Sequence, residues 1–257
     1  MGNELPTREK YEKLLFRRDK LRKEAEQNLQ LYLHTFGELL TGLLRVKVSC
    51  IEKKKIIAYC RSLTNRGKRI DITRLTEFID RQMENFRRQL TDFANSAQAC
   101  RDLTRLTEAE VAKVKFLYRS IAKKIHPDLC PVTAGSEELL NIWNDVVTAY
   151  KNNDLPKLEE LSVQIECILR NLGHDVEESD IPDIEAKITA LESEIDSIIS
   201  TDPYQYWLLL SDPKMVEEKK KELEQEIEEY TKYEAKLQSV IAGLIEGGAQ
   251  FTQSWEN

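Results

Sequence analysis

The most constraining feature of the chain is an apolar stripe that runs through most of its first quarter. From about Thr7, apolar side chains recur at steps of three, four or seven residues, the spacing of one face of an α-helix. The stripe continues to residues 63–67, where Asn65 and Gly67 supply a turn. The sequence therefore predicts one helix, roughly 80 Å long at about 1.5 Å per residue. The positions with this spacing are Tyr11, Leu14, Leu21, Ala25, Tyr32, Phe36, Leu39 and Leu43, and the apolar pattern runs on through Ile51, Ile56 and Ile57.

Three further segments show the same helical period. Asp71 or Thr73 can cap a second helix with a stripe from Leu75 to Phe93, so the first hundred residues predict an antiparallel hairpin. In the last third, the stripes of residues 184–198 and 216–244 predict another hairpin. A proline-bracketed apolar segment, residues 202–213, separates these two helices.

The composition agrees with a chain built from long helices. Nine glycines and seven prolines in 257 residues are few, which disfavours many turns and short strands. We therefore predict an all-α fold in which long antiparallel coiled-coil hairpins flank a central helical hairpin. The predicted domains are a basic hairpin over residues 1–100, a central segment over 101–170 and an acidic hairpin over 171–257.

The five cysteines are widely scattered and contain no C-x-x-C pair, which argues against zinc or iron-sulfur binding. Free thiols fit a reducing compartment. The sequence offers neither an apolar leader nor a stretch of roughly 18 apolar residues, so we expect no secretion and no membrane insertion. We thus expect a cytoplasmic protein with no metal site and no cofactor.

Charge is distributed unevenly along the chain. Residues 1–100 carry 21 basic and 13 acidic side chains, whereas residues 151–257 carry 10 and 25. Oppositely charged solvated helix faces explain this asymmetry most simply. The alternative is nucleic-acid binding by the basic arm, for which residues 53–55 (Lys-Lys-Lys) and 66–69 (Arg-Gly-Lys-Arg) are the best clusters. Because such clusters are more often solvated faces, nucleic acid is disfavoured as a partner.

The central segment begins with a capping box, in which Thr107 and Glu110 each satisfy a backbone donor at a helix start. The helix buries a stripe of Val114, Leu117, Ile121 and Ile125 and carries basic residues mostly away from it. Pro127 must stop the helix, since proline lacks a backbone donor and disfavours helical geometry at the residue before it.

A second helix, starting near Ser136, carries a matching stripe of Leu139, Trp143, Val146 and Tyr150. The two helices therefore predict a hairpin with His126-Pro127-Asp128 exposed at its tip. A catalytic role for this triplet is disfavoured, because no nucleophile motif, phosphate-binding glycine loop or metal-ligand set accompanies it.

These residues resemble the J domain of DnaJ-like proteins over about residues 103–160. In that family, a Tyr-Arg-x-x-Ala stretch leads to His-Pro-Asp, as Tyr118, Arg119 and Ala122 do here. The family's third helix commonly ends in Ala-Tyr, as at residues 149–150. The arrangement of the whole chain also resembles a group of uncharacterised bacterial J-domain proteins.

The resemblance implies docking on a DnaK-type (70-kDa heat-shock) chaperone and faster ATP hydrolysis by that partner, with no enzymatic activity in this chain. It implies that Asp128 reaches an arginine of the chaperone and that His126 stabilises the turn or contacts the partner. Basic residues would meet the chaperone's acidic surface. The implied partner-binding residues are Lys115, Tyr118, Arg119, Lys123, Lys124, His126, Pro127 and Asp128.

The sequence departs from the family at two points. The usual short first helix, with its Tyr-Tyr and Leu-Gly pairs, is absent, and Ser120 stands where the family is often basic. Because a two-helix hairpin buries too little alone, we expect another helix, from residues 72–98 or 155–169, to cover its stripe. Neither a Gly/Phe-rich linker nor a zinc module follows, so client delivery by such modules is not implied.

Other functions stay open for the two arms. The chain could be a scaffold that forms homo-oligomers through its coiled-coil seams and whose J-like hairpin has lost its partner. Equally, the arms could contact a client or scaffold protein. The apolar segment at residues 202–213 is either the packed end of a hairpin or a contact patch.

Overall fold

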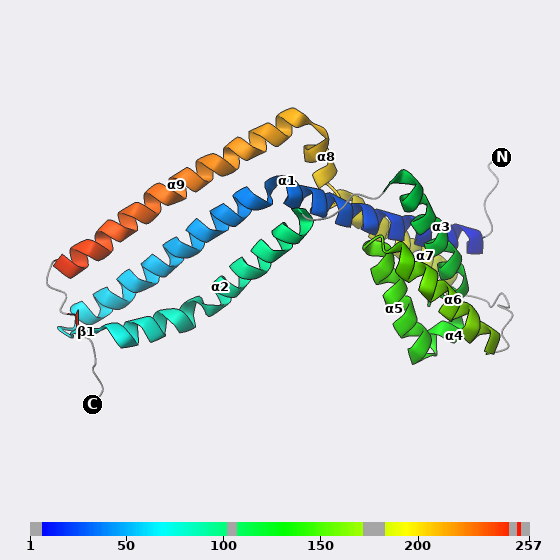
Figure 1. The fold of residues 1–257 in the computed structure, drawn as a ribbon, viewed down its shortest axis with the longest axis horizontal. Helices are drawn as coiled ribbons and strands as arrows, with labels where there is room; N and C mark the ends of the chain where they lie inside the picture. Colours follow the sequence, from blue (N-terminus) through cyan, green and yellow to red (C-terminus); the bar gives the residue numbers. More distant parts are fainter. Residues whose placement is uncertain (1–6, 102–106, 172–182, 247–250, 253–257) are drawn as a thin grey trace. The chain divides into compact units, whose positions relative to one another are not determined.

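A computed structural model describes residues 7–101, 107–171, 183–246 and 251–252. Over these residues the fold is all-α, as predicted, with two strands of two residues each (Figure 1). The elements are α1 (Thr7–Thr64), β1 (Ile70–Asp71), α2 (Ile72–Arg101), α3 (Glu108–Ile125), α4 (Pro131–Ala134), α5 (Glu137–Lys151), α6 (Leu155–Asn171), α7 (Ile184–Ser200), α8 (Tyr206–Ser211), α9 (Pro213–Glu246) and β2 (Phe251–Thr252).

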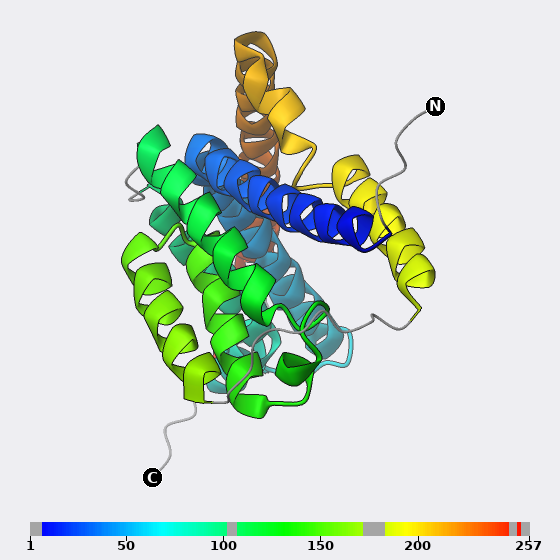
Figure 2. The ribbon, with the colours of Figure 1, turned by 90° about the vertical axis from the view of Figure 1, so that its right-hand side faces the viewer.

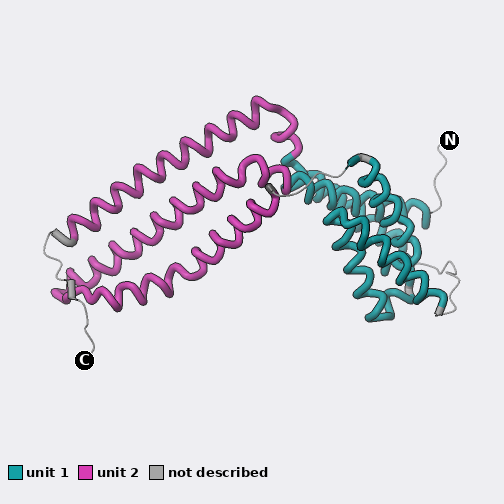
Figure 3. Tube along the Cα trace, viewed as in Figure 1, with its two compact units in different colours: residues 1–29, 104–206 teal, residues 30–103, 207–257 magenta. Residues whose placement is uncertain are grey.

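The chain divides into two compact units (Figure 3). Unit 1 comprises residues 1–29 and 104–206, and unit 2 comprises residues 30–103 and 207–257. This division differs from the three consecutive domains that we predicted, because α1 contributes to both units. It also places α7 and α9, the two helices of the predicted acidic hairpin, in different units.

Both of those helices pack on α1. In unit 1, Ile188 and Leu191 of α7 form an apolar cluster with Tyr11 and Leu15 of α1. In unit 2, Leu223 of α9 packs with residues of α1 that lie further along the chain. The sequence period identified each apolar face correctly but did not identify the partner of that face.

In unit 2, α1 lies between α2 and α9 (Figure 1). Val48 of α1 packs against Ile79 and Met83 of α2, so these two helices form the antiparallel hairpin that the sequence predicted. At the turn of this hairpin, β1 pairs in parallel with β2, with Ile70 opposite Phe251.

In unit 1, α3, α5 and α6 form a three-helix bundle, seen together in Figure 2. Val114 and Ile121, the stripe of α3 that needed a cover, are fully buried, and Leu158 and Leu161 of α6 pack in the same cluster. Of the two predicted covers, residues 155–169 therefore fill this place, whereas residues 72–98 belong to unit 2. The short helix α4 was not predicted.

Candidate functional site

The helix that leads to the His-Pro-Asp loop begins and ends as its sequence requires. Thr107 caps α3: its hydroxyl accepts a hydrogen bond from the backbone N–H of Glu110, whose carboxylate accepts from the backbone N–H of Thr107. At the other end, His126 has extended backbone angles, φ −61° and ψ 125°, because Pro127 excludes the helical conformation there. The loop therefore starts at a fixed residue.

Backbone hydrogen bonds close the loop. The carbonyl oxygen of His126 accepts from the N–H groups of Leu129 at 2.9 Å and Cys130 at 2.8 Å. Leu129 is buried in a cluster with Tyr11 and Leu15 of α1, so the loop is also anchored to the first helix of the chain. These contacts fix the backbone at Asp128.

His126 points into the protein. Its side chain is buried, with 3% exposed, and lies edge-on to the ring of Trp143 at 4.6 Å between centroids. Its Nδ1 accepts a hydrogen bond of 3.0 Å from the backbone N–H of Asp128. Burial lowers the pKa of His126, against the opposing effect of Asp128, and so favours the neutral imidazole that this hydrogen bond requires. The imidazole thus stabilises the turn.

Asp128 has the opposite environment. Its side chain is 44% exposed, and its carboxylate lies 4.0 Å from His126 Nδ1. Its charge acts on α1: burial first, and then Asp128, raise the pKa of Tyr11 to about 12. The loop therefore presents the carboxylate of Asp128 to solvent, while the backbone N–H of Asp128 is fixed by its hydrogen bond to His126.

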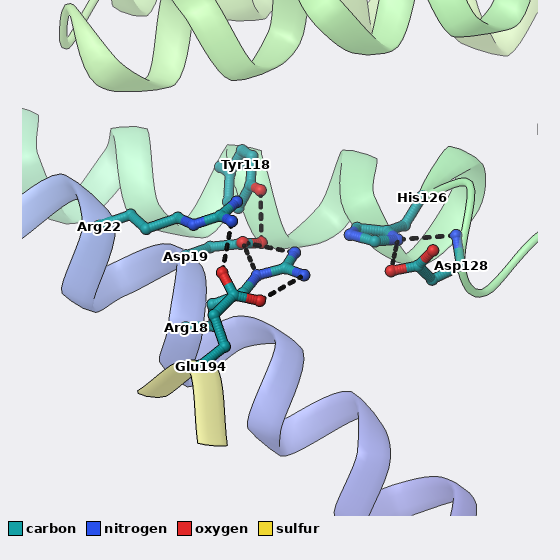
Figure 4. A network of polar contacts seen from close by, with 7 residues as sticks. All are labelled: Arg18, Asp19, Arg22, Tyr118, His126, Asp128 and Glu194. Carbon is teal, nitrogen blue, oxygen red and sulfur yellow. Dashed lines mark hydrogen bonds and ion pairs between the residues drawn. The ribbon is translucent and has the colours of Figure 1, made fainter. Parts of the chain in front are cut away.

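A buried polar network ties α1 to α3 (Figure 4). The carboxylate of Asp19 accepts from the hydroxyl of Tyr118 at 2.7 Å and from the guanidinium of Arg18 at 2.8 and 3.0 Å. Arg18 and Arg22 in turn contact Glu194 of α7. Burial opposes the charge of Arg18, but the carboxylates of Asp19, Glu194 and Asp128 outweigh it, and the pKa of the guanidinium is raised.

Aromatic stacking continues this contact into the bundle. Tyr118 stacks on Tyr150 of α5 with 3.9 Å between ring centroids, and Trp143 lies 5.9 Å away. The ammonium of Lys23 lies over the Tyr150 ring at 3.9 Å. Lys23 is 2% exposed and its amine has no hydrogen-bond partner; burial, and then Lys115, lower its pKa to about 8. Residues of α1 thus contact Tyr118 and Tyr150 on the α3–α5 hairpin.

The structure separates the implied partner-binding residues into two groups. Arg119 and Lys123 are exposed on α3 and Lys115 is partly exposed, whereas Lys124 is paired with Glu166 of α6 at 2.9 Å. Tyr118, 3% exposed, and His126 face the interior, so a docking surface made by this hairpin does not include their side chains. Pro127 is partly buried beside the exposed Asp128.

Sequence reasoning missed the residues of α1 that complete this site. Tyr11, Leu15, Asp19 and Lys23 follow one another at steps of four and so lie on one line of the helix. Because charged Asp19 and Lys23 lie in line with apolar Tyr11 and Leu15, the sequence pattern indicates that the two charged side chains are buried. Their partner, the central hairpin, lies about a hundred residues away, and helical periodicity does not identify such a contact.

The site offers a fixed exposed carboxylate and a row of cations, an arrangement suited to contact with another protein. Within the described ranges, no group of three or more His, Cys, Asp or Glu side chains is placed to hold a metal ion. No helix in the described part of the chain combines the length and apolar character needed to cross a membrane. Comparisons with protein-family models, curated proteins and solved structures find no match to this chain.

Proposed function

We propose that this protein is a J-domain-type co-chaperone, which docks on a DnaK-type chaperone through the His-Pro-Asp loop and accelerates its ATP hydrolysis. One observation carries the proposal: buried His126 holds the backbone N–H of Asp128 at 3.0 Å while the carboxylate of Asp128 stays exposed. The loop presents its charge in one geometry, which lowers the ordering cost of binding.

Two further features support it. Arg119 and Lys123 are exposed on the helix that leads to the loop, where they would steer an acidic partner surface and increase its association rate. In addition, α6 covers the apolar stripe of α3, and the first part of α1 packs against Tyr118 and Tyr150. The hairpin is thus complete without the family's usual opening segment.

In this mechanism the protein is an effector. Asp128 pairs with a cation of the chaperone, and docking favours the chaperone conformation that hydrolyses ATP. His126 and Tyr118 act as positioning residues, since both are buried. Lys124 contributes less than Arg119 and Lys123, because Glu166 already neutralises it.

The test is single-turnover ATP hydrolysis by a DnaK-type chaperone in the presence of the full chain. We expect stimulation by the natural protein and its loss with Asp128→Asn. Asp145→Asn is the matched control, because Asp145 is an exposed carboxylate on α5 of the same hairpin. Stimulation should survive this second change.

The cations are tested in the same assay. Arg119→Ala with Lys123→Ala should raise the concentration needed for half-maximal stimulation and weaken its salt dependence, whereas Lys151→Ala, at an exposed lysine of α5, should do neither. The co-chaperone proposal fails if the natural protein gives no stimulation, or if Asp128→Asn stimulates as well as the natural protein does.

A further inference from the structure

The turn of the hairpin in unit 2 carries a cluster of four exposed cations, Arg61, Arg66, Lys68 and Arg69, here called the basic tip. The sequence contains no acidic residue from position 53 to position 70. Within the described structure, none of the four side chains makes an ion pair or a hydrogen bond. The positive charge of the basic tip is therefore not used within the described structure.

The other basic cluster of the first arm differs sharply. Lys53 is paired with Glu234 of α9 at 2.9 Å, Lys54 lies over the ring of Tyr233 at 5.0 Å, and the amine of Lys55 donates to Gln82 at 3.0 Å. These lysines contact residues of α2 and α9. The structure thus distinguishes two clusters that the sequence alone could not separate.

The cationic side chains of the basic tip do not serve as caps for the C-terminal end of α1. The last carbonyl groups of the helix accept backbone N–H donors: Leu63 accepts from Arg66 and Lys68, both at 3.0 Å, and Thr64 accepts from Gly67 at 2.9 Å. Gly67 has a φ of 65°, the left-handed conformation that closes a helix end in this way. The side chains of the basic tip remain available to a ligand.

The tip is also held in place on its far side. Ile70 is fully buried and pairs with β2, and the carboxylate of Asp71 accepts a 3.2 Å hydrogen bond from the backbone N–H of Arg74, at the start of α2. Residues 65–69 therefore form a short turn anchored at both ends. Cations on such a turn lose little backbone freedom on binding.

We propose that the basic tip binds the phosphate backbone of a nucleic-acid duplex without sequence preference. Three of the four cations are arginines, whose planar guanidinium groups pair with phosphate through two hydrogen bonds. A convex turn at the end of a helical hairpin can reach phosphates along a groove. This inference does not depend on the co-chaperone function.

The surroundings of the tip favour nucleic acid over an anionic membrane. Amphipathic segments that lie in a membrane surface combine cations with several apolar side chains that insert between lipids. From residue 61 to residue 74 the structure offers one exposed large apolar side chain, Ile72, which is 38% exposed. Within residues 61–74, the charge of the tip is thus not accompanied by an inserting surface.

The experiment measures binding of the full chain to a fluorescein-labelled duplex of mixed sequence, by anisotropy over a series of salt concentrations. Affinity should fall steeply with salt, because each phosphate contact contributes about −0.9 to the slope of log K against log salt. Changing Arg66, Lys68 and Arg69 together to Gln should make that slope shallower by up to about 3 and weaken binding at low salt at least tenfold.

The matched control changes Lys53, Lys54 and Lys55 to Gln, which alters net charge equally. Melting curves of both variants verify folding. We expect the control to bind the duplex within a few-fold of the natural chain. Equal losses in the two variants would attribute binding to overall charge and overturn the proposal, as would absence of binding by the natural chain.

Vesicles containing phosphatidylserine complete the test. Binding of the natural chain to vesicles but not to the duplex would overturn the proposal in favour of a membrane surface. The tip variant should also stimulate the DnaK-type chaperone as fully as the natural chain, so the outcomes of the two proposals are independent.

Discussion

The two units differ in where they place polar contacts. The described part of unit 1 buries four polar or charged side chains, Asp19, Lys23, His126 and Thr133. In the described part of unit 2, the buried side chains are apolar or cysteine, and the ion pairs, such as Lys47 with Glu226, lie at the surface. Buried polar contacts cost desolvation and need exact partners, whereas a helical seam with surface ion pairs tolerates change.

The difference matches the two proposed tasks. A docking loop needs one fixed geometry, and the buried contacts of His126 and Tyr118 impose it. An exposed cationic turn needs only to be carried at the end of a stable hairpin. Substitutions of comparable chemistry in the two units should therefore have unequal effects, and the following changes test that comparison.

The largest effect is expected in the buried network of unit 1. Asp19→Asn removes the carboxylate nearest the Arg18 guanidinium, leaving the more distant Glu194, and weakens the hydrogen bond from Tyr118. Removing one partner of a buried pair costs about 3–5 kcal/mol, so urea unfolding should shift by this amount. Hydrogen exchange should locate the loss in α1 and α3. A loss below about 1 kcal/mol would show that the network adds no more than a surface pair.

Substitutions at two glycines of α1, Gly37 and Gly42, compare how closely its neighbouring helices approach it in unit 2. A Cβ at Gly37 would lie 2.9 Å from the Cβ of Ala97 on α2, so Gly37→Ala must push the helices apart and cost about 1–3 kcal/mol. A Cβ at Gly42 would meet Ile227 at 3.7 Å, an ordinary contact. Gly42→Ala should then stabilise the helix by up to about 1 kcal/mol. Thermal melting compares the two, and changes of the same sign would contradict the close approach at Gly37.

Much of the fold could be predicted from the sequence, because helical periods and caps are local properties. The single long helix, the capping box at Thr107, the stop at Pro127 and the start after Ser136 all agree with the structure. Each depends on residues within one or two turns of the chain.

The pairing of helices was less predictable, because an apolar stripe fits more than one partner. Residues 184–198 and 216–244 predict a hairpin, yet α7 and α9 both pack on α1 instead. For the candidate site, the motif gave the loop residues but not the burial of Tyr118 and His126. Tyr118 contacts Asp19 of α1 and His126 packs against Trp143 of α5, and no local pattern specifies either contact.

Between pH 8 and pH 10, Lys23 of unit 1 and the buried thiols of unit 2 should change stability in opposite directions. Burial lowers the pKa of Lys23 to about 8, below its value of 10.5 in the unfolded chain, so the unfolded state binds more protons and this group adds stability as pH rises from 8 to 10. Burial raises the pKa of the Cys50 and Cys60 thiols of unit 2, which removes stability as pH rises through about 9.

Lys23→Met isolates the first effect. At pH 7 it should stabilise unit 1 by about 1 kcal/mol, since an apolar side chain of similar length replaces a buried amine without a hydrogen-bond partner. It should also remove the gain between pH 8 and pH 10, measured by urea unfolding. If the natural chain and the variant show the same pH dependence, Lys23 is protonated normally in the folded state.

A smaller pH effect is expected on the acidic side. Because burial lowers the pKa of His126 below its ordinary 6.5, the unfolded state takes up a proton first as pH falls, and stability decreases below about pH 6.5. His126→Gln should remove this decrease in stability. The measurement is hydrogen exchange of the loop amides at pH 7 and pH 5.5. Exchange that accelerates equally in both proteins would assign the acid sensitivity to another group.

The smallest effect is expected for the Lys53–Glu234 ion pair of unit 2, which we compare with the buried Arg18–Asp19 pair of unit 1. Glu234 accepts from Ser49 and Lys53, which lowers the pKa of its carboxyl group, but the pair remains open to solvent. Glu234→Gln should therefore cost no more than about 1 kcal/mol in urea unfolding, with a clear dependence on salt. Compared with Asp19→Asn, the same chemical change of a carboxylate to an amide separates the two units. A cost at Glu234 equal to that at Asp19 would mean that unit 2 depends on its polar contacts as much as unit 1 does.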